Sequence, residues 1–498
     1  MSISLFRTLA IASSGLLLAG CATQAEIADF SDPTRGFAEV RDTTRETSNK
    51  QSVWIQSHQE AEAAAARVHE LIHGKTINTE TAVQAALLAN KGLQAAYSEI
   101  GMSAADVWQE ALPANPKLTV MFSQIGVART IESLITANIA RAISYKARLS
   151  VAEAKLRKSQ LQAIEATLRV ANETRVAWIN SVSAWERAGH VKQAIAASDA
   201  GSELAKQLGG TGAIPKAAQA REHVNYAELT AQLASARLEA REAKQVLIRK
   251  MGVWGKETKF SVPNRLPPLP RRVTKKTAIA AEALRNRIDL VIAMADLEIV
   301  ARSHGLTKVT RYVSDLDLSG GVEIERGEDG GDEVSGVIEF DFVIPIFDSG
   351  QARLRKAEFA YMRAANLVAQ RAVDIRSEAR TAYEAYRGRY DIARHHLNAV
   401  APLRKVLQEQ ALLNNNGMIT STFELLQDVR AKVNSDLQAD NAKRDFWLAE
   451  AGLKAAIYGG GGAGGGGGEM AGLADAGGGG HYSEMRFTFK QTSTIRSF

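Results

Sequence analysis

Cysteine is nearly absent from this chain of 498 residues, and proline and aromatic residues are scarce. A single Cys excludes an internal disulfide and any metal site built from several thiolates. Ten Pro residues and an aromatic content of 6% leave long stretches of Ala, Leu, Glu, Lys, Arg and Gln, which favour helices. The net charge of +6 is a small excess of 61 basic over 55 acidic residues, and it predicts no nucleic-acid partner. Long helices are the first expectation.

Catalytic and metal-binding motifs are also missing. No Ser-His-Asp order, zinc motif or nucleotide loop stands in a suitable context, and we predict that the protein is not an enzyme. His395 and His396 are adjacent, so on a helix their rings point about 100° apart. His69 and His73 are four residues apart and share a helix face, but the sequence offers no third ligand nearby. No metal site is therefore predicted.

The N-terminus has the outline of a secretory signal. Arg7 precedes an apolar run from Leu9 to Ala19, which is too short for a spanning helix. The sequence LAGC at 18–21 resembles a bacterial lipobox, whose cysteine is acylated and becomes the mature N-terminus. We predict a lipid, palmitate included, on Cys21 as the only covalent group and no other cofactor. A plain signal peptide with an incidental cysteine is the alternative.

Composition changes along the chain predict six segments. They are a lipoprotein signal peptide at 1–20, a lipid-anchored tether at 21–60, a first repeat at 61–260, a Pro-rich linker at 261–274, a second repeat at 275–458 and a Gly-rich flexible tail at 459–498. The two repeats share landmarks: Gly212-Ala213-Ile214 matches Gly417-Met418-Ile419, and Val224 matches Val429, both at an offset of 205. This spacing predicts an internally duplicated protein.

Each repeat contains two short segments in which apolar and polar residues alternate. The predicted strands cover about 117–126 and 134–143 in the first repeat, and about 316–325 and 334–346 in the second. In the last of them, Ile338, Phe340, Phe342 and Ile344 share one face and Glu339 and Asp341 the other. Segments of this length match tilted strands of a membrane barrel. A small soluble sheet covered by helices is the alternative.

Three further stretches carry a family resemblance. They are RNRIDLVIA at 285–293, IPIFDSGQARLRKAE at 344–358 and NNNGMITSTFELLQDVRAKV at 414–433. Together with the repeated plan, they resemble the TolC family of outer membrane efflux proteins (outer membrane factors), and the lipobox makes the chain similar to its lipoprotein branch of CusC and OprM. The resemblance implies a mixed α and β membrane protein: a homotrimer in which four strands per chain form one 12-stranded outer membrane β-barrel. A long periplasmic α-helical barrel continues from it.

The same resemblance implies roles for particular residues. Helical-tip turns are expected at Gly212 and Gly417, and a periplasmic pore constriction at Glu424 and Asp428, although a solvated helix surface explains these acids equally well. On the last strand, Ile338, Phe340, Phe342 and Ile344 are expected to face outer membrane lipid, and the acids Glu339 and Asp341 the lumen.

The predicted function is that of a passive exit duct. Ala22, in place of an Asp after the cysteine, predicts lipid anchoring in the outer membrane of a Gram-negative bacterium, with a periplasmic extension. The resemblance implies a tripartite efflux or type I secretion system, in which a periplasmic adaptor protein and an inner membrane transporter are the partners. The alternative is a lipid-anchored coiled-coil protein with a structural or adhesive role in the envelope and no pore. The exported substrate is not readable from the sequence.

Overall fold

The computed structural model describes residues 32, 34–125, 128–212, 214–273, 278–311, 316–326, 332–417 and 419–461. The chain divides into two compact units, Met1–Gly461 and Gly462–Phe498, and every described residue belongs to the first. Cys21 and the tail beyond Gly461 lie outside the described residues, so the predicted lipid site and tail remain predictions.

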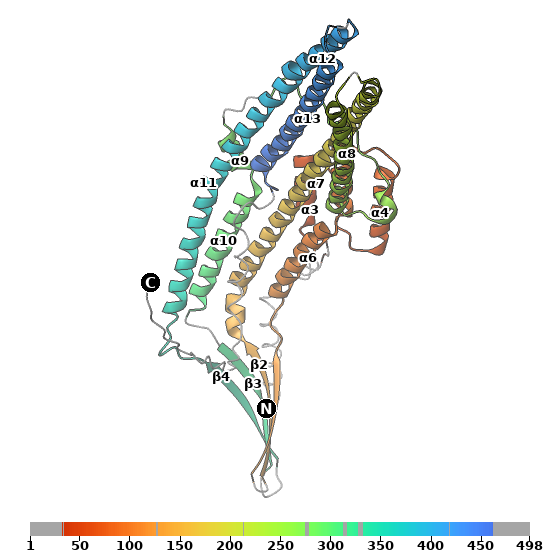
Figure 1. Ribbon diagram of the computed structural model, residues 1–498. Helices are drawn as coiled ribbons and strands as arrows, with labels where there is room; N and C mark the ends of the chain where they lie inside the picture. Colours follow the sequence, from red (N-terminus) through yellow and green to blue (C-terminus); the bar gives the residue numbers. More distant parts are fainter. Residues whose placement is uncertain are drawn as a thin grey trace, which may run out of the picture. The chain divides into compact units, whose positions relative to one another are not determined.

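Helices make up most of the described unit, and two hairpins interrupt them (Figure 1). The elements up to the Pro-rich segment are α3 (Phe37–Ser48), α4 (His58–Ile72), α5 (Thr79–Ala89), α6 (Lys91–Ala111), β1 (Lys117–Ile125), β2 (Ala128–Asn138), α7 (Ile139–Gly210), α8 (Lys216–Met251) and the 3-10 helix η1 (Gly255–Thr258). Those after it are α9 (Ile279–Asn286), α10 (Ile288–Val309), β3 (Leu316–Arg326), β4 (Asp332–Phe342), α11 (Gln351–His395), the π-helix η2 (His396–Val400), α12 (Ala401–Asn416) and α13 (Thr422–Tyr458).

Helix α7 is the central element of the helical region. Its 72 residues correspond to about 108 Å at 1.5 Å per residue. It contacts α8, α6, α13, α10, α5 and α3, and its buried residues are mainly Ala, Ser and Thr with a few large side chains such as Trp178. Small side chains let neighbouring helices approach closely, which explains how one helix serves so many partners.

The helices form a row with α7 near its middle. Nearer the sheet, α6 contacts α7, α7 contacts α10, and α10 contacts α11 (Figure 1). At the other end of the helices, α8 contacts α7, α7 contacts α13, and α13 contacts α12. Helices α11 and α12 therefore lie at one end of the row, and α6 and α8 at the other.

The four strands form one antiparallel sheet in the order β1-β2-β3-β4. Its register places Phe122 opposite Ile131, Ile131 opposite Ile324, and Ile324 opposite Val334. The turn residues 126–127 and 327–331 are outside the described residues.

Two strand boundaries differ from the prediction. The second strand covers Ala128–Asn138 rather than 134–143, because α7 begins at Ile139, where the Asn138 side chain accepts a hydrogen bond from Arg141 N at 2.6 Å. The fourth covers Asp332–Phe342 rather than 334–346, because Phe342 pairs with Leu316, the first residue of β3. Ile344 therefore lies beyond β4, and its predicted place on that strand is wrong.

Two segments expected to be extended or free pack against helices. Residues 37–48 of the predicted tether form α3, whose Val40 is fully buried in the core shared with α6 and α7. In the Pro-rich segment, the carbonyls of Pro267 and Pro270 accept hydrogen bonds from Trp447 Nε1 and Tyr390 Oη at 3.1 and 3.0 Å. The polar atoms of two aromatic side chains, one on α11 and one on α13, thus fix the Pro-rich segment against these helices.

Candidate channel-forming surfaces

One face of the sheet is mainly apolar, and its polar residues are Gln124, Arg129, Ser133, Arg326 and Asp332. The register brings the following residues to that face: Leu118, Val120 and Phe122 of β1; Ile131, Ile135 and Ala137 of β2; Leu316, Leu318, Val322 and Ile324 of β3; and Val334, Ile338, Phe340 and Phe342 of β4. The side chains of β4 on this face are open, with Ile338 73% and Phe340 67% exposed. A row of large apolar side chains across four strands is far more than scattered surface hydrophobics, and it indicates a surface made for an apolar environment.

The opposite face is polar and acidic. It carries Glu132, Asp317, Glu323, Glu325, Glu333, Glu339 and Asp341, with Lys117 as a basic residue at one end. Glu132 stands opposite Glu323, and Asp317 opposite Asp341. Like charges directly opposite one another destabilise a sheet, so this arrangement fits a surface that is in contact with water and cations.

Polar side chains on this face hold the two hairpins together. Thr136 Oγ1 lies 2.8 Å from Ser319 Oγ, and Asn138 Nδ2 donates to Asp317 Oδ1 at 2.8 Å. Asn138 thereby joins the end of β2 to β3 while its other side-chain atom caps α7. Glu339 and Asp341, the acids predicted to face a lumen, lie on this polar face. Ile338, Phe340 and Phe342, predicted to face lipid, lie on the apolar face.

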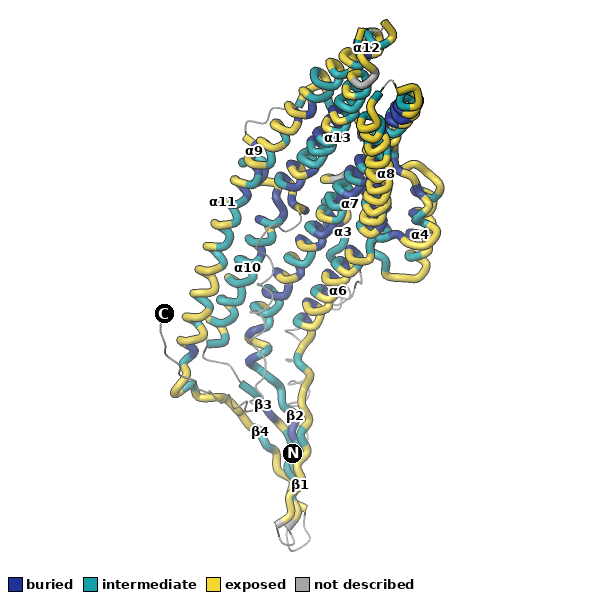
Figure 2. The backbone as a smooth tube through the Cα atoms, in the orientation of Figure 1, coloured by how far each residue is buried: buried dark blue, intermediate teal, exposed yellow. Residues whose placement is uncertain are grey.

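The sheet has two open edges at the two ends of the helical row. In the described part of the chain, β1 pairs only with β2, and β4 only with β3. Strand β1 follows α6, and β4 leads to α11, so each open edge continues into a helix at the same end of the row. Figure 2 shows the large exposed portion of α11 and α12. The edge strands β1 and β4 therefore leave backbone groups open for pairing, and α11 and α12 keep one side exposed beside their contacts with α10 and α13.

The far end of the helical region carries two turns. At the first, Gly212 has φ +74°, a left-handed conformation that favours glycine. At the second, Gly417 has φ −80°, and Ser421 starts α13 by accepting a hydrogen bond from Glu424 N at 3.4 Å. The two predicted turn glycines are thus both at helix ends, but only Gly212 adopts a backbone conformation that requires glycine.

Glu424 and Asp428 lie one helical turn apart at the start of α13. Glu424 is exposed and Asp428 half-buried. Nearby, Arg430 pairs with Glu222 of α8, and Leu426 lies against Gly201 of α7, where a Cβ would meet Leu426 Cδ2 at 2.8 Å. The close approach at Gly201 brings α13 against α7 at Leu426, which lies between the two acids in the sequence. Their role in closing a pore stays a prediction.

Two groups of titratable residues lie farther from the turns. Between α7 and α13, His190 Nε2 is 3.0 Å from Asp440 Oδ2, and Glu186 pairs with Lys443 at 3.3 Å. Hydrogen bonding to the Asp440 carboxylate raises the pKa of His190 above its usual value, while burial acts in the opposite direction.

The second group joins His69 of α4 and His73, the C-cap of that helix, to Glu257 of η1. A third potential ligand is therefore present, contrary to the expectation from the sequence. It was missed because Glu257 is 188 residues from His69 along the chain.

No helix in the described ranges is both long enough and apolar enough to cross a membrane. No protein-family model matches this sequence, and no curated protein matches it.

Solved structures do resemble the chain. A membrane protein from Pseudomonas aeruginosa is 16% identical with a TM-score of 0.65, and the match covers 76% of this chain and 93% of that one. The Campylobacter jejuni CmeC outer membrane channel is 17% identical with a TM-score of 0.63, covering 77% and 86%. The outer membrane protein VceC from Vibrio cholerae is 15% identical with a TM-score of 0.62, covering 79% and 96%. The chain therefore has the fold of outer membrane channel proteins, and the resemblance to the TolC family is confirmed at the level of fold.

Proposed function

We propose that this protein is the outer membrane channel of a tripartite efflux or type I secretion system. The observation that carries the proposal is the sheet with one open apolar face, one acidic face and two open edges. An open edge in lipid leaves backbone groups unpaired at several kcal/mol each, so the strands must close with those of other chains. A four-stranded sheet that spans lipid requires such closure.

Three copies satisfy this requirement. Strand β4 of each copy pairs with β1 of the next, which gives a barrel of 12 strands, and α11 and α12 of each copy pack against α6 and α8 of the next. The exposed apolar residues of these helices support the contact: Phe359, Met362, Val373, Leu403, Val406 and Leu413 at one end of the row, and Val224, Leu238 and Val246 at the other. The acidic face lines the lumen, where Glu339 and Asp341 favour cations. The repeated order of helices and strands in the two halves of the chain is the product of a duplication.

The chain's fold supports its place in the outer membrane, and the lipobox supports a lipid on Cys21. The helical turns at Gly212 and Gly417 are the end that meets a periplasmic adaptor protein and, through it, an inner membrane transporter. The protein is a passive duct, and the transporter supplies the energy. Glu424 and Asp428 narrow the periplasmic end.

Purified full-length protein tests the proposal. It should migrate as a heat-modifiable trimer in SDS gels and give discrete conductance steps in planar bilayers. Protein with Cys21→Ser should lose incorporation of labelled palmitate and still form channels once inserted, because the barrel and not the lipid makes the pore. A monomer without conductance, soluble after removal of the lipid, contradicts the proposal and favours a pore-free envelope protein.

A further inference from the structure

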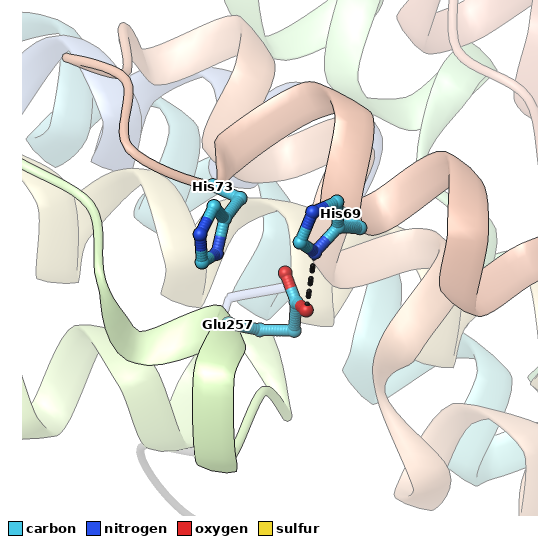
Figure 3. Close-up of side chains that lie close together, drawn as sticks. All are labelled: His69, His73 and Glu257. Carbon is cyan, nitrogen blue, oxygen red and sulfur yellow. Dashed lines mark hydrogen bonds and ion pairs between the residues drawn. The ribbon is translucent and has the colours of Figure 1, made fainter.

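A cluster of two imidazoles and a carboxylate stands outside the strands and the helical turns. His69 and His73 come from the last turn and the C-cap of α4, and Glu257 comes from η1, after α8 (Figure 3). One potential ligand atom from each lies within 4.8 Å of the others. Histidines four residues apart on a helix, with a carboxylate from another segment, are a donor set that zinc accepts.

Backbone pairing fixes the two segments relative to each other. Gly74 N donates to Lys259 O at 2.7 Å, Ser261 N to Lys75 O at 2.9 Å, and Ile77 N to Ser261 O at 2.9 Å. These bonds form between residues that follow α4 and residues that follow η1. The three side chains are therefore held together by the fold, and their closeness does not depend on a chance surface contact.

The hydrogen bonds also determine which histidine nitrogen is available. His73 Nδ1 lies 3.2 Å from the Lys256 carbonyl oxygen, which can only accept, so Nδ1 carries the proton and Nε2 holds the free lone pair. A carbonyl that orients a histidine through its other nitrogen is the usual support of a metal ligand. The rings of His69 and His73 stack with centroids 4.3 Å apart and an interplanar angle of 20°, so the two imidazoles lie side by side.

Only one of the two carboxylate oxygens of Glu257 has a hydrogen-bond partner among the described residues. Its Oε1 lies 2.8 Å from His69 Nδ1, whereas Oε2 is buried and has no hydrogen-bond partner among the described residues. A buried carboxylate oxygen without a partner is costly, and a cation beside it removes that cost. Tetrahedral zinc ligands lie about 3.3 Å apart at bond lengths of about 2.0 Å, so the ion would take the place of the proton shared by His69 and Glu257 after a small outward movement.

We propose that His69, His73 and Glu257 bind a divalent transition-metal ion of the zinc class, which cross-links α4 to η1. Water or an added ligand completes the coordination. Imidazole ligands select zinc, copper or nickel over magnesium, which prefers oxygen. The site lies outside the residues assigned to the duct, so the inference does not depend on the proposed channel function.

The other histidine cluster gives an internal control. Around Glu186, His190 and Asp440, Lys443 Nζ already pairs with Glu186 at 3.3 Å, and Leu266 N donates to the second oxygen of Glu186 at 3.0 Å. A cation there would have to displace an ammonium group. We therefore expect the metal at the first cluster only.

The test is zinc titration of tag-free, full-length protein in detergent after chelator treatment, followed by calorimetry. We expect one zinc per chain, with binding at least tenfold weaker in Glu257→Gln and in His73→Ala, and unchanged in His190→Gln and His395→Ala. Zinc should also raise the thermal midpoint of the unmodified protein but not that of Glu257→Gln, a conservative change that keeps the fold. Lack of stoichiometric zinc binding, equal affinity in Glu257→Gln, or loss of binding in His190→Gln overturns the proposal.

Discussion

Helix α7 and the α11–α12 pair occupy corresponding places after the two hairpins, yet they differ in packing. Helix α7 runs unbroken from Ile139 to Gly210 and is buried along its length, whereas the second path is interrupted by the π-helix His396–Val400 and has few buried residues. Pro402, at the start of α12, cannot donate a helical hydrogen bond, which accounts for the altered pattern just before it. Helix α7 thus supports the fold of the chain, whereas α11 and α12 keep the exposed apolar surface that the proposed trimer would cover.

The largest expected effect is in the α7 core. Trp178 is 3% exposed and donates from Nε1 to Ile77 O at 3.0 Å. Trp178→Ala should cost about 3–5 kcal/mol of unfolding free energy, because it leaves a cavity and an unpaired carbonyl. Tyr383→Ala, at the offset of 205 in half-buried α11, should cost less than half as much in thermal or denaturant unfolding. Equal losses would remove the distinction between the two helices.

The apolar face of β4 provides the next test. Phe340→Arg should impair assembly of the proposed trimer by about 2–4 kcal/mol, because it places a charge on the face proposed to meet lipid. Phe340→Leu is the matched control and should assemble normally. The measurement is the fraction of heat-modifiable trimer in outer membrane extracts. Normal assembly of Phe340→Arg would show that this face does not contact lipid.

The contact between α7 and α13 should be sensitive to pH. Because the folded-state pKa of His190 is raised, its pairing with Asp440 stabilises the protein fully below the unfolded pKa of about 6.5 and is lost as pH rises through the folded value. Thermal midpoints from pH 6 to pH 9 should therefore fall by an amount that corresponds to about 1–2 kcal/mol. His190→Gln should remove this part of the decrease, whereas the exposed His395→Gln should keep it.

The acids at the start of α13 should affect transport more than stability. Glu424→Ala with Asp428→Ala should increase the conductance of the reconstituted trimer and reduce its preference for cations, with less than about 1 kcal/mol change in unfolding free energy. Asp391→Ala, on α11, is a control for the loss of a helix carboxylate. Unchanged conductance and selectivity would assign the two acids to a solvated surface.

The smallest effect is expected at the polar face of β4. Glu339→Gln removes one charge and keeps the shape of the side chain, so assembly should be normal and cation preference slightly lower. Reversal potentials in a salt gradient measure this change. A shift as large as that of the α13 double variant would place the main selectivity region in the sheet.

The sequence predicted the local structure well where periodicity was strong. Alternation in VIEFDF places Ile338 and Phe340 on one face of β4 and Glu339 and Asp341 on the other, as the register shows. It failed at strand ends: Ile139 and Ile143 continue the alternation of β2, but the Asn138 cap starts a helix there. Ile139 and Ile143 are four residues apart, a spacing that fits a helix face as well as one side of a strand, and tertiary pairing decides between them.

Most element types, the two faces of the strands and the turns at Gly212 and Gly417 follow from the sequence alone, because each depends on neighbours within a few residues. The central place of α7, the packing of α3 in the core and the meeting of Glu257 with His69 and His73 emerge only in the folded chain. These contacts link residues far apart in the chain, and their energy depends on which surfaces meet, which local patterns do not encode.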